Sequence, residues 1–259
     1  MTRIIALANQ KGGVGKTTTA INLGAALAKL GRRVLIIDVD PQGNATSGLG
    51  LRAQEGRSTY DLLVGDAKFA DIVVPTAFDR LWLIPAGPDL SGAEVEMAAM
   101  MAREFRLRRA IEGEVGRYEY VLFDCPPSLG LLTVNALTAA DEVIIPVQCE
   151  YLALEGLSQL KRTLDLVKRN LNRDLRLRGL LLTMYDRRTN LSEQVAQEVR
   201  SHFPNTFRAV VPRSVRVSEA PSHGLPINVY DPNSPAAAAY AAFAKEVQKG
   251  VGAMTEVSS

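Results

Sequence analysis

Residues 9–18 read Asn-Gln-Lys-Gly-Gly-Val-Gly-Lys-Thr-Thr, and this stretch decides the fold of the chain. Gly15-Lys16-Thr17 matches the end of the phosphate-binding loop pattern G-x-x-x-x-G-K-[ST], but Gln10 and Lys11 stand where the usual loop begins. An ordinary loop of this kind has one lysine for its own nucleotide, whereas this loop has two, Lys11 and Lys16. A second lysine beside two consecutive glycines suggests a loop that serves a nucleotide shared between two subunits.

The sequence on either side of the loop supports a nucleotide site. Residues 3–8 form a short, mostly apolar run that is typical of a buried parallel strand, and residues 17–30 have the apolar spacing of a helix that stops at Gly31. A strand, a glycine-rich turn and a helix N-terminus together make an anion site, because backbone N–H groups and the helix dipole favour negative charge. We expect Lys16 to reach the β- and γ-phosphates and the Thr17 hydroxyl to hold Mg²⁺.

Three carboxylates follow two further predicted strands. Residues 33–37 form a strand that ends in Asp38-Val39-Asp40, and residues 120–123 form another that ends in Asp124. Acids at the carboxyl ends of parallel strands lie where open α/β sheets bind ligands. Asp124 suits the role of holding Mg²⁺ through water, and Asp40 suits positioning or activating the attacking water, since phosphoryl transfer needs mostly placement and charge neutralisation. For Asp38 alone, a helix N-cap or turn role is an equal alternative.

The chain resembles the ParA/Soj partitioning ATPases, which belong with MinD to the deviant Walker A group of P-loop proteins. The resemblance rests on motifs that run nearly from end to end: Lys11-Gly-Gly-Val-Gly-Lys-Thr-Thr, Asp38-Val-Asp-Pro-Gln-Gly-Asn, Asp124-Cys-Pro-Pro-Ser, Pro146-Val-Gln-Cys-Glu-Tyr, Thr183-Met-Tyr-Asp-Arg-Arg-Thr-Asn and Pro212-Arg-Ser-Val-Arg-Val-Ser-Glu-Ala-Pro. The first motif is specific to the superfamily, and the last two point to the ParA/Soj branch.

The resemblance implies a role for most of these residues. Lys11 is expected to be the signature lysine that reaches the partner subunit's nucleotide in an ATP sandwich dimer, and Gly12 to lie at the subunit contact. Asp40 is expected to be the catalytic aspartate, with Lys11 and Lys16 as the catalytic lysines. The metal site would comprise Thr17, Asp40 and, through water, Asp124. The implied nucleotide-binding residues are Lys11, Gly12, Gly13, Val14, Gly15, Lys16, Thr17 and Thr18, with Met184 and Pro212 flanking the adenine unless they simply pack in the core.

Alternating strand and helix patterns predict a single α/β P-loop NTPase domain over residues 1–251, with a mostly parallel twisted sheet and helices on both faces. We expect residues 49–58 to form a loop and residues 252–259 a flexible tail. Further strands are predicted at residues 81–85, 142–147, 177–183, 208–211 and 227–230, and further helices at 92–112, 131–139, 154–170, 192–203 and 234–251.

The composition argues against several classes of protein. A chain of 259 residues with 47% hydrophobic residues can bury one large core. Its two cysteines, Cys125 and Cys149, match no zinc-site spacing, and no apolar run approaches the ~20 residues that span a bilayer. Because a strand begins near residue 3, we expect no signal peptide and a cytoplasmic protein.

The charge is unevenly distributed along the chain. The whole chain has a net charge of +2, yet residues 151–220 contain 13 Lys and Arg against 7 Asp and Glu, a local charge of +6. Such a cluster can neutralise DNA phosphates without reading sequence, although a solvated helix face is favoured on charge alone. The resemblance shifts the balance, because Arg188 and Arg216 match the family's non-specific DNA-binding arginines. The DNA-binding residues predicted near the last strands are Arg187, Arg188, Arg213 and Arg216.

The function that the resemblance implies is a Mg²⁺-dependent ATPase that is slow without its partner. Its ATP-bound homodimer is expected to bind non-specific double-stranded DNA at the nucleoid. Hydrolysis, stimulated by a ParB-like centromere-binding protein, would dissolve the dimer and drive segregation of chromosome or plasmid DNA.

The alternative is a MinD-like membrane-associated ATPase that positions the cell-division machinery. That class needs a basic amphipathic C-terminal helix, whereas Tyr240, Phe243 and Val247 are expected to face the core here. An iron–sulfur reductase would need bridging cysteines, which Cys125 does not match. A DNA-binding module without enzymatic activity would not need Lys16 together with Asp40.

Overall fold

A computed structural model describes residues 2–65, 67–150 and 153–249. Within these residues the chain forms one eight-stranded sheet with the order β3-β4-β2-β5-β1-β6-β7-β8, and every neighbouring pair is parallel except β3 with β4. The strands are β1 Arg3–Leu7, β2 Val34–Asp38, β3 Val74–Pro75, β4 Leu81–Ile84, β5 Tyr120–Asp124, β6 Glu142–Gln148, β7 Arg176–Tyr185 and β8 Thr206–Pro212.

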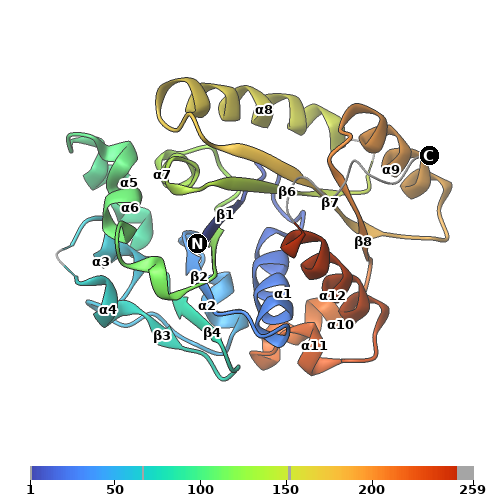
Figure 1. Cartoon of the computed structure of the whole chain (residues 1–259), viewed down its shortest axis with the longest axis horizontal. Coiled ribbons are helices and arrows are strands. Elements are labelled where there is room, and N and C mark those ends of the chain that lie inside the picture. The colour runs from blue at the N-terminus through green and yellow to red at the C-terminus, as the bar shows by residue number, and fades with distance from the viewer. Residues whose placement is uncertain (1, 66, 151–152, 250–259) are drawn as a thin grey trace.

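Helices cover both faces of the sheet (Figure 1), which confirms the predicted fold class. On one face α7 and α8 pack against the strands, and on the other face α1 and α12 do so. The helices are α1 Lys16–Lys29, α2 Asn44–Gly48, α3 Thr59–Leu63, α4 Phe69–Ile72, α5 Leu90–Ala98, α6 Arg106–Ile111, α7 Leu131–Ala139, α8 Ala153–Asn170, α9 Asn190–His202, α10 Val215–Glu219, α11 Ile227–Tyr230 and α12 Pro235–Gln248, with short 3₁₀ turns at Arg103–Phe105, Val115–Arg117 and Ala220–His223.

The central strands are apolar because both of their faces are covered. Every residue of β2 and β5 is buried, as expected of parallel strands between two helical layers. The last residue of each strand, Asp38 or Asp124, carries a carboxyl group although it is buried. The two strand-end carboxylates therefore lie buried at one edge of the sheet, where the carboxyl ends of the parallel strands meet.

The C-terminal helix α12 is anchored at both ends. The Ser234 hydroxyl accepts from the Ala237 N–H at 3.2 Å as an N-cap, and Pro235 follows at the first helical position. At the other end the buried Arg178 guanidinium donates to main-chain carbonyls, at 3.0 Å for Glu246. The apolar face of α12, with Tyr240, Phe243 and Val247 at most 1% exposed, is in the core, as predicted. None of the helices in the described part of the chain combines the length and the hydropathy of a membrane span.

Two predicted elements differ from the structure. The predicted strand at residues 227–230 is wrong, because Ile227–Tyr230 form the helix α11. Local acceptors satisfy its backbone: Asn22 Oδ1 accepts from the Ile227 N–H at 2.7 Å, and the Pro226 carbonyl accepts from the Tyr230 N–H at 3.0 Å. No ninth strand is therefore added within the described chain, and β8 is an edge strand.

The predicted helix at residues 92–112 is interrupted. It begins earlier, where Asp89 accepts from the Leu90 N–H at 3.0 Å, and α5 ends at Ala98 before the chain resumes in the 3₁₀ turn and α6. Ala102, with φ 52°, adopts a left-handed conformation that no continuous helix of L-residues allows. Residues 49–58 are irregular apart from one bridge between Gln54 and Arg57. The predicted tail, 252–259, lies outside the described residues.

Candidate functional site

The phosphate-binding loop leads from the end of β1 into α1. Gly15 has φ 88°, a left-handed conformation that favours glycine, and it turns the chain so that Lys16 becomes the first residue of α1. Asn9 stabilises the start of the loop, since its Nδ2 donates to the Pro146 carbonyl at 2.7 Å and its Oδ1 accepts from the Lys11 N–H at 3.0 Å. The loop is therefore held to β6 on one side and enters a helix on the other.

Lys16 is placed inside this loop. Only 6% of its surface is exposed, and its ammonium donates to the Lys11 carbonyl at 3.2 Å. Burial lowers the pKa of Lys16, while the negative charges of Asp124 and Asp40 act in the opposite direction. A buried cation beside the N–H groups of a helix N-terminus is suited to hold a phosphate, because the ammonium and the N–H groups both attract negative charge to the same place.

Asp38 and Asp124 lie side by side at the carboxyl ends of β2 and β5, where the sheet register pairs them directly. Both side chains are completely buried. Burial raises the pKa of both carboxyls, and the charge of Asp38 raises the pKa of Asp124 further. The pair therefore needs a compensating positive charge when both groups are ionised.

Asp124 has the environment expected of a metal-site carboxylate. Neither of its oxygens is hydrogen-bonded to any described residue, although both are buried. The Thr17 hydroxyl is near enough to lower its pKa without forming a hydrogen bond to it. No group of three or more His, Cys, Asp or Glu in the described part of the chain could hold a metal by itself. Mg²⁺ fits this donor set, because it is commonly bound by one or two carboxylates, a hydroxyl, waters and phosphate oxygens.

The structure separates the roles of Asp38 and Asp40. Asp38 Oδ2 accepts from both the N–H and the hydroxyl of Thr46, at 2.9 and 2.7 Å, and its Oδ1 accepts from the Asp40 N–H at 3.2 Å. The sequence left open whether Asp38 belongs to the nucleotide site or holds a turn. These contacts are those of a residue that holds a turn. Asp40 is 6% exposed and its Oδ1 accepts from the Gln42 N–H at 3.0 Å. Asp38 thus fixes the turn on which Asp40 lies.

Lys11 has a different environment from Lys16. Its side chain is 38% exposed, and its ammonium lies 3.9 Å from Glu150 Oε2. The other Glu150 oxygen accepts from Arg213 at 3.2 Å. Lys11 therefore does not occupy the position of Lys16 within its own loop, and Glu150, which the sequence reasoning missed, joins it to an arginine from another loop. Gly12, predicted at a subunit contact, could carry a Cβ without a clash, since the nearest atom to an added Cβ is Pro127 Cβ at 3.9 Å, an ordinary van der Waals distance.

A cavity of about 200 Å³ opens beside the loop and is lined by Gly15, Thr18, Met184 and Pro212 among others. The structure thus brings the two predicted adenine neighbours together with the phosphate loop. Met184 has φ 51°, which is uncommon for a residue other than glycine and marks a locally strained backbone at this cavity. The Thr183 hydroxyl donates to the Val14 carbonyl at 2.8 Å and ties the end of β7 to the loop.

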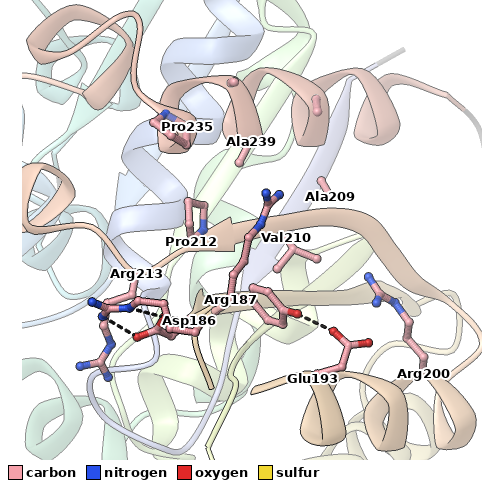
Figure 2. A pocket seen from close by; sticks show the side chains of 14 residues that line it. Asp186, Arg187, Glu193, Arg200, Ala209, Val210, Pro212, Arg213, Pro235 and Ala239 are labelled. Carbon is pink, nitrogen blue, oxygen red and sulfur yellow. Dashed lines mark hydrogen bonds and ion pairs between the residues drawn. The ribbon is translucent and has the colours of Figure 1, made fainter. Parts of the chain in front are cut away.

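The predicted DNA-binding arginines are divided between two places. A cavity of about 880 Å³ lies along β8 between α9 and α12 (Figure 2), and we call it the α9–α12 groove. Arg187, Arg188 and Arg213 line it, whereas Arg216 does not and pairs with Glu219 at 3.2 Å on α10. A fourth arginine of the groove, Arg200 on α9, was missed by the sequence reasoning, because a single basic residue on an amphipathic helix resembles any solvated position.

The fold and the loop together define the class of protein. The parallel sheet, the glycine-rich loop with its buried lysine, and the strand-end carboxylates are those of a P-loop ATPase domain. In agreement, the family model described as "AAA domain" matches residues 2–177.

Comparison with curated relatives narrows the class to a family. The sporulation initiation inhibitor protein Soj of Bacillus subtilis is 57% identical, over 95% of this chain and 98% of that protein. The chromosome partitioning protein ParA of Caulobacter vibrioides is 56% identical, over 95% of this chain and 93% of that protein. The chain belongs to the Soj/ParA family of chromosome-partitioning ATPases.

A solved structure shares the fold over nearly the whole chain. Cobyrinic acid a,c-diamide synthase from Mycobacterium smegmatis, determined with an ATP analogue and magnesium, has a TM-score of 0.84 and 40% identity, covering 96% of this chain and 95% of that one. Its name denotes a different reaction from partitioning, so the likeness bears on the fold and on the nucleotide and metal bound in that protein.

Proposed function

We propose that the chain binds ATP and Mg²⁺, forms an ATP-dependent homodimer, binds DNA non-specifically in that state and releases it on hydrolysis. The observation that carries this proposal is the contrast between the two loop lysines. Lys16 is buried with its ammonium inside its own loop, and Lys11 is partly exposed with its ammonium directed to Glu150 outside the loop. One lysine serves the subunit's own phosphates, and the other is available to a nucleotide held by a second subunit.

The hydrolysis step draws on a small set of residues. Lys16 and the N–H groups of the loop hold the β- and γ-phosphates. Thr17 and, through water, Asp124 would hold Mg²⁺, which would supply the charge that neutralises the phosphates during phosphoryl transfer. Asp40, on the turn fixed by Asp38, orients the attacking water, and Lys11 of the partner adds a positive charge as the dimer forms. Met184 and Pro212 flank the base.

The DNA-binding step uses the arginines near the last strands. Arg187, Arg188, Arg213 and Arg216 contact phosphates on DNA of any sequence, so binding occurs wherever the nucleoid offers a duplex. A dimer presents two such surfaces, and doubling the phosphate contacts makes DNA binding depend on ATP. A ParB-like centromere-binding protein stimulates hydrolysis, and the resulting cycle segregates chromosome or plasmid DNA in the cytoplasm.

A membrane-associated role of the MinD type is not favoured. Such a role requires an amphipathic helix whose apolar face is free to enter lipid. The apolar face of α12 is buried against α1 and β8, with Phe243 and Val247 fully covered. We therefore propose DNA, and no membrane, as the surface on which the dimer acts.

The test measures DNA binding and molecular mass in the same three states: with ATP, with ADP and without nucleotide. We expect a dimer that binds non-specific duplex only with ATP. The variant Lys16→Ala should lower ATP affinity by roughly 10- to 100-fold, as expected when charge-assisted hydrogen bonds worth about 1.5–3 kcal/mol are lost. The exposed α8 variant Lys168→Ala serves as the control. ATP affinity near the wild-type value in Lys16→Ala refutes the site, and an ATP dimer that ignores DNA refutes the DNA step.

A further inference from the structure

A small cavity lies at the edge of the sheet opposite the nucleotide loop, and we call it the Trp82 slot. Its volume is about 160 Å³, and its lining side chains are those of Arg33, Trp82, Arg117 and Tyr118. Arg33 directly precedes β2 and Tyr118 comes two residues before β5, so the slot lies at the amino ends of these strands. The strand-end aspartates lie at the other end of the same strands, which have five residues each and span about 16 Å. Occupation of the slot therefore leaves the nucleotide site open.

The main chain around the slot is held in place by its own hydrogen bonds. On one side the Thr2 hydroxyl donates to the Tyr118 carbonyl at 2.8 Å, and the Tyr118 N–H donates to the Val115 carbonyl at 2.9 Å. On the other side the Arg33 N–H donates to Glu119 Oε2 at 3.0 Å, and the Arg33 carbonyl accepts from the Glu119 N–H at 2.8 Å. The slot is therefore preformed, and a partner that binds there does not have to order this part of the chain.

The two aromatic rings of the slot meet edge to face, and one of them carries an unpaired hydroxyl. The ring centroids of Trp82 and Tyr118 lie 5.5 Å apart at an interplanar angle of 65°. Tyr118 is only 2% exposed, yet its hydroxyl has no hydrogen-bond partner among the described residues. Burial raises the pKa of this hydroxyl, while Arg117 acts in the opposite direction, so the group stays protonated at neutral pH and can donate. Buried polar groups rarely lack a partner, and an acceptor on a bound molecule would supply one here.

Two exposed arginines give the slot a positive rim. In the part of the chain that the structure describes, neither Arg33 nor Arg117 has a carboxylate within ion-pair distance of its guanidinium. Glu119, which contacts the Arg33 main chain, pairs instead with Arg32 at 2.9 Å. The Arg117 guanidinium lies over the Tyr118 ring, 5.1 Å from its centroid, as a cation–π contact. Both guanidinium groups are therefore available to carboxylates of a partner, which they bind through charge-assisted hydrogen bonds.

The size and the composition of the slot favour a protein partner over a small molecule. Pockets that hold small molecules commonly have about 300–1,000 Å³, and this cavity is smaller. It has room for one anchoring side chain of a larger partner. Tryptophan, tyrosine and arginine are enriched among the residues that contribute most to binding at protein interfaces, and every residue that lines the slot is of one of these types. The rings suit an apolar anchor, and the arginines suit acids on either side of it.

We propose that the Trp82 slot docks an acidic segment of a partner protein, with one apolar side chain of that segment against the two aromatic rings and its neighbouring carboxylates on Arg33 and Arg117. This interaction goes beyond the proposed function, since it uses neither the nucleotide loop nor the arginines near the last strands. Because the slot is remote from the nucleotide site, the partner binds with the same affinity in every nucleotide state. The slot thus attaches the ATPase to another protein throughout its cycle.

The experiment uses Trp82 as its reporter, because it is the only tryptophan of the chain and its fluorescence therefore reports on the slot alone. The probe is a library of short tryptophan-free peptides, selected on the full-length protein and counter-selected on the double variant Arg33→Ala with Arg117→Ala. We expect the enriched peptides to share an apolar residue flanked by Asp or Glu, and to change Trp82 emission on titration. Each single variant should weaken a selected peptide by about 5- to 30-fold, as charge-assisted contacts are lost. Since both arginines are exposed, the variants should keep the wild-type melting temperature.

The matched control is Arg169→Ala with Arg173→Ala, which removes the same charge from exposed positions at and just after the end of α8. It should bind the selected peptides as the wild type does, and the wild type should bind them equally with ATP, with ADP and without nucleotide. The proposal is overturned if no enriched peptide distinguishes the wild type from the double variant, or if Trp82 emission does not change. Equal losses from the control overturn it by showing that overall charge decides. Binding only with ATP, or displacement of the peptides by a single-stranded oligonucleotide at matched ionic strength, also contradicts it.

Discussion

The carboxylate of Asp124 is buried, and neither of its oxygens has a hydrogen-bond partner among the described residues. Burial and the neighbouring Asp38 raise its pKa above the value near 3.9 that an exposed aspartate has. The folded state therefore binds this proton more tightly than the unfolded state does. It follows that the ionised carboxylate destabilises the nucleotide-free fold at pH values above its raised pKa, and that this effect is absent below about pH 4.

We expect Asp124→Asn to raise the melting temperature of the nucleotide-free protein at neutral pH. Relief of about 1–2 kcal/mol of desolvation would raise it by roughly 2–8 °C in a domain of this size. The gain should shrink as the pH falls and vanish near pH 4, while the stabilisation by ATP with Mg²⁺ should be lost at every pH. Differential scanning fluorimetry across this range checks both effects, with the exposed Asp165→Asn as the control. A gain that is the same at all pH values would contradict the assignment.

At the scale of elements, the turn between β2 and α2 is held by one buried hydrogen-bond chain. The Ala86 N–H donates to the Thr46 hydroxyl at 2.9 Å, and that hydroxyl donates to Asp38 at 2.7 Å. Asp40 lies on the segment that this chain fixes. The arrangement joins the loop after β4 to the residue that we propose to orient the attacking water.

Thr46→Val keeps the shape of the side chain and removes both hydrogen bonds. We expect it to cost roughly 2–3 kcal/mol in urea unfolding, because a buried N–H and a buried carboxylate each lose a partner. Since Asp40 is then less firmly placed, kcat should fall more than ATP affinity does. Thr163→Val on α8, whose hydroxyl makes one exposed bond of 3.4 Å, should leave both quantities unchanged. A loss of stability with an unchanged kcat would limit Thr46 to a structural role.

The sequence predicted most elements because strand and helix periodicities agree with their final environments. The central strands β2 and β5 are apolar up to their terminal aspartates, and α1, α7 and α12 lie within one residue of the predicted bounds or inside them. The prediction failed at Ile227–Tyr230, whose β-branched and aromatic residues favour a strand. In the structure the Pro226 carbonyl and the Asn22 side chain accept hydrogen bonds from this segment, and it forms a helix instead. The sequence also could not identify Glu150 or Arg200 as site residues, since the loops and strands that each of them contacts are distant in sequence.

At the scale of the whole molecule, the loop presents a surface that a single subunit leaves open. Gly12 does not need to be glycine for its own fold, because a Cβ there would meet only Pro127, at 3.9 Å, and its φ is not in the left-handed region. The same holds for Gly116, which is remote from the nucleotide loop in sequence and has nothing within 4 Å of an added Cβ. The two positions therefore make a matched pair for testing whether a second subunit approaches the loop.

We expect Gly12→Val to fold with a melting temperature within a few degrees of the wild type, because an added Cβ meets only Pro127, at an ordinary contact distance, and the backbone is not left-handed. It should bind ATP through Lys16 and yet remain a monomer with ATP, since the added methyl groups occupy the proposed subunit contact. DNA affinity should then fall to that of one arginine surface, with about half the salt slope of the dimer. Light scattering and anisotropy measure the two effects, with Gly116→Val expected to dimerise normally. An ATP dimer of Gly12→Val with wild-type DNA affinity would place the subunit contact elsewhere and remove the reason for the second lysine in the loop.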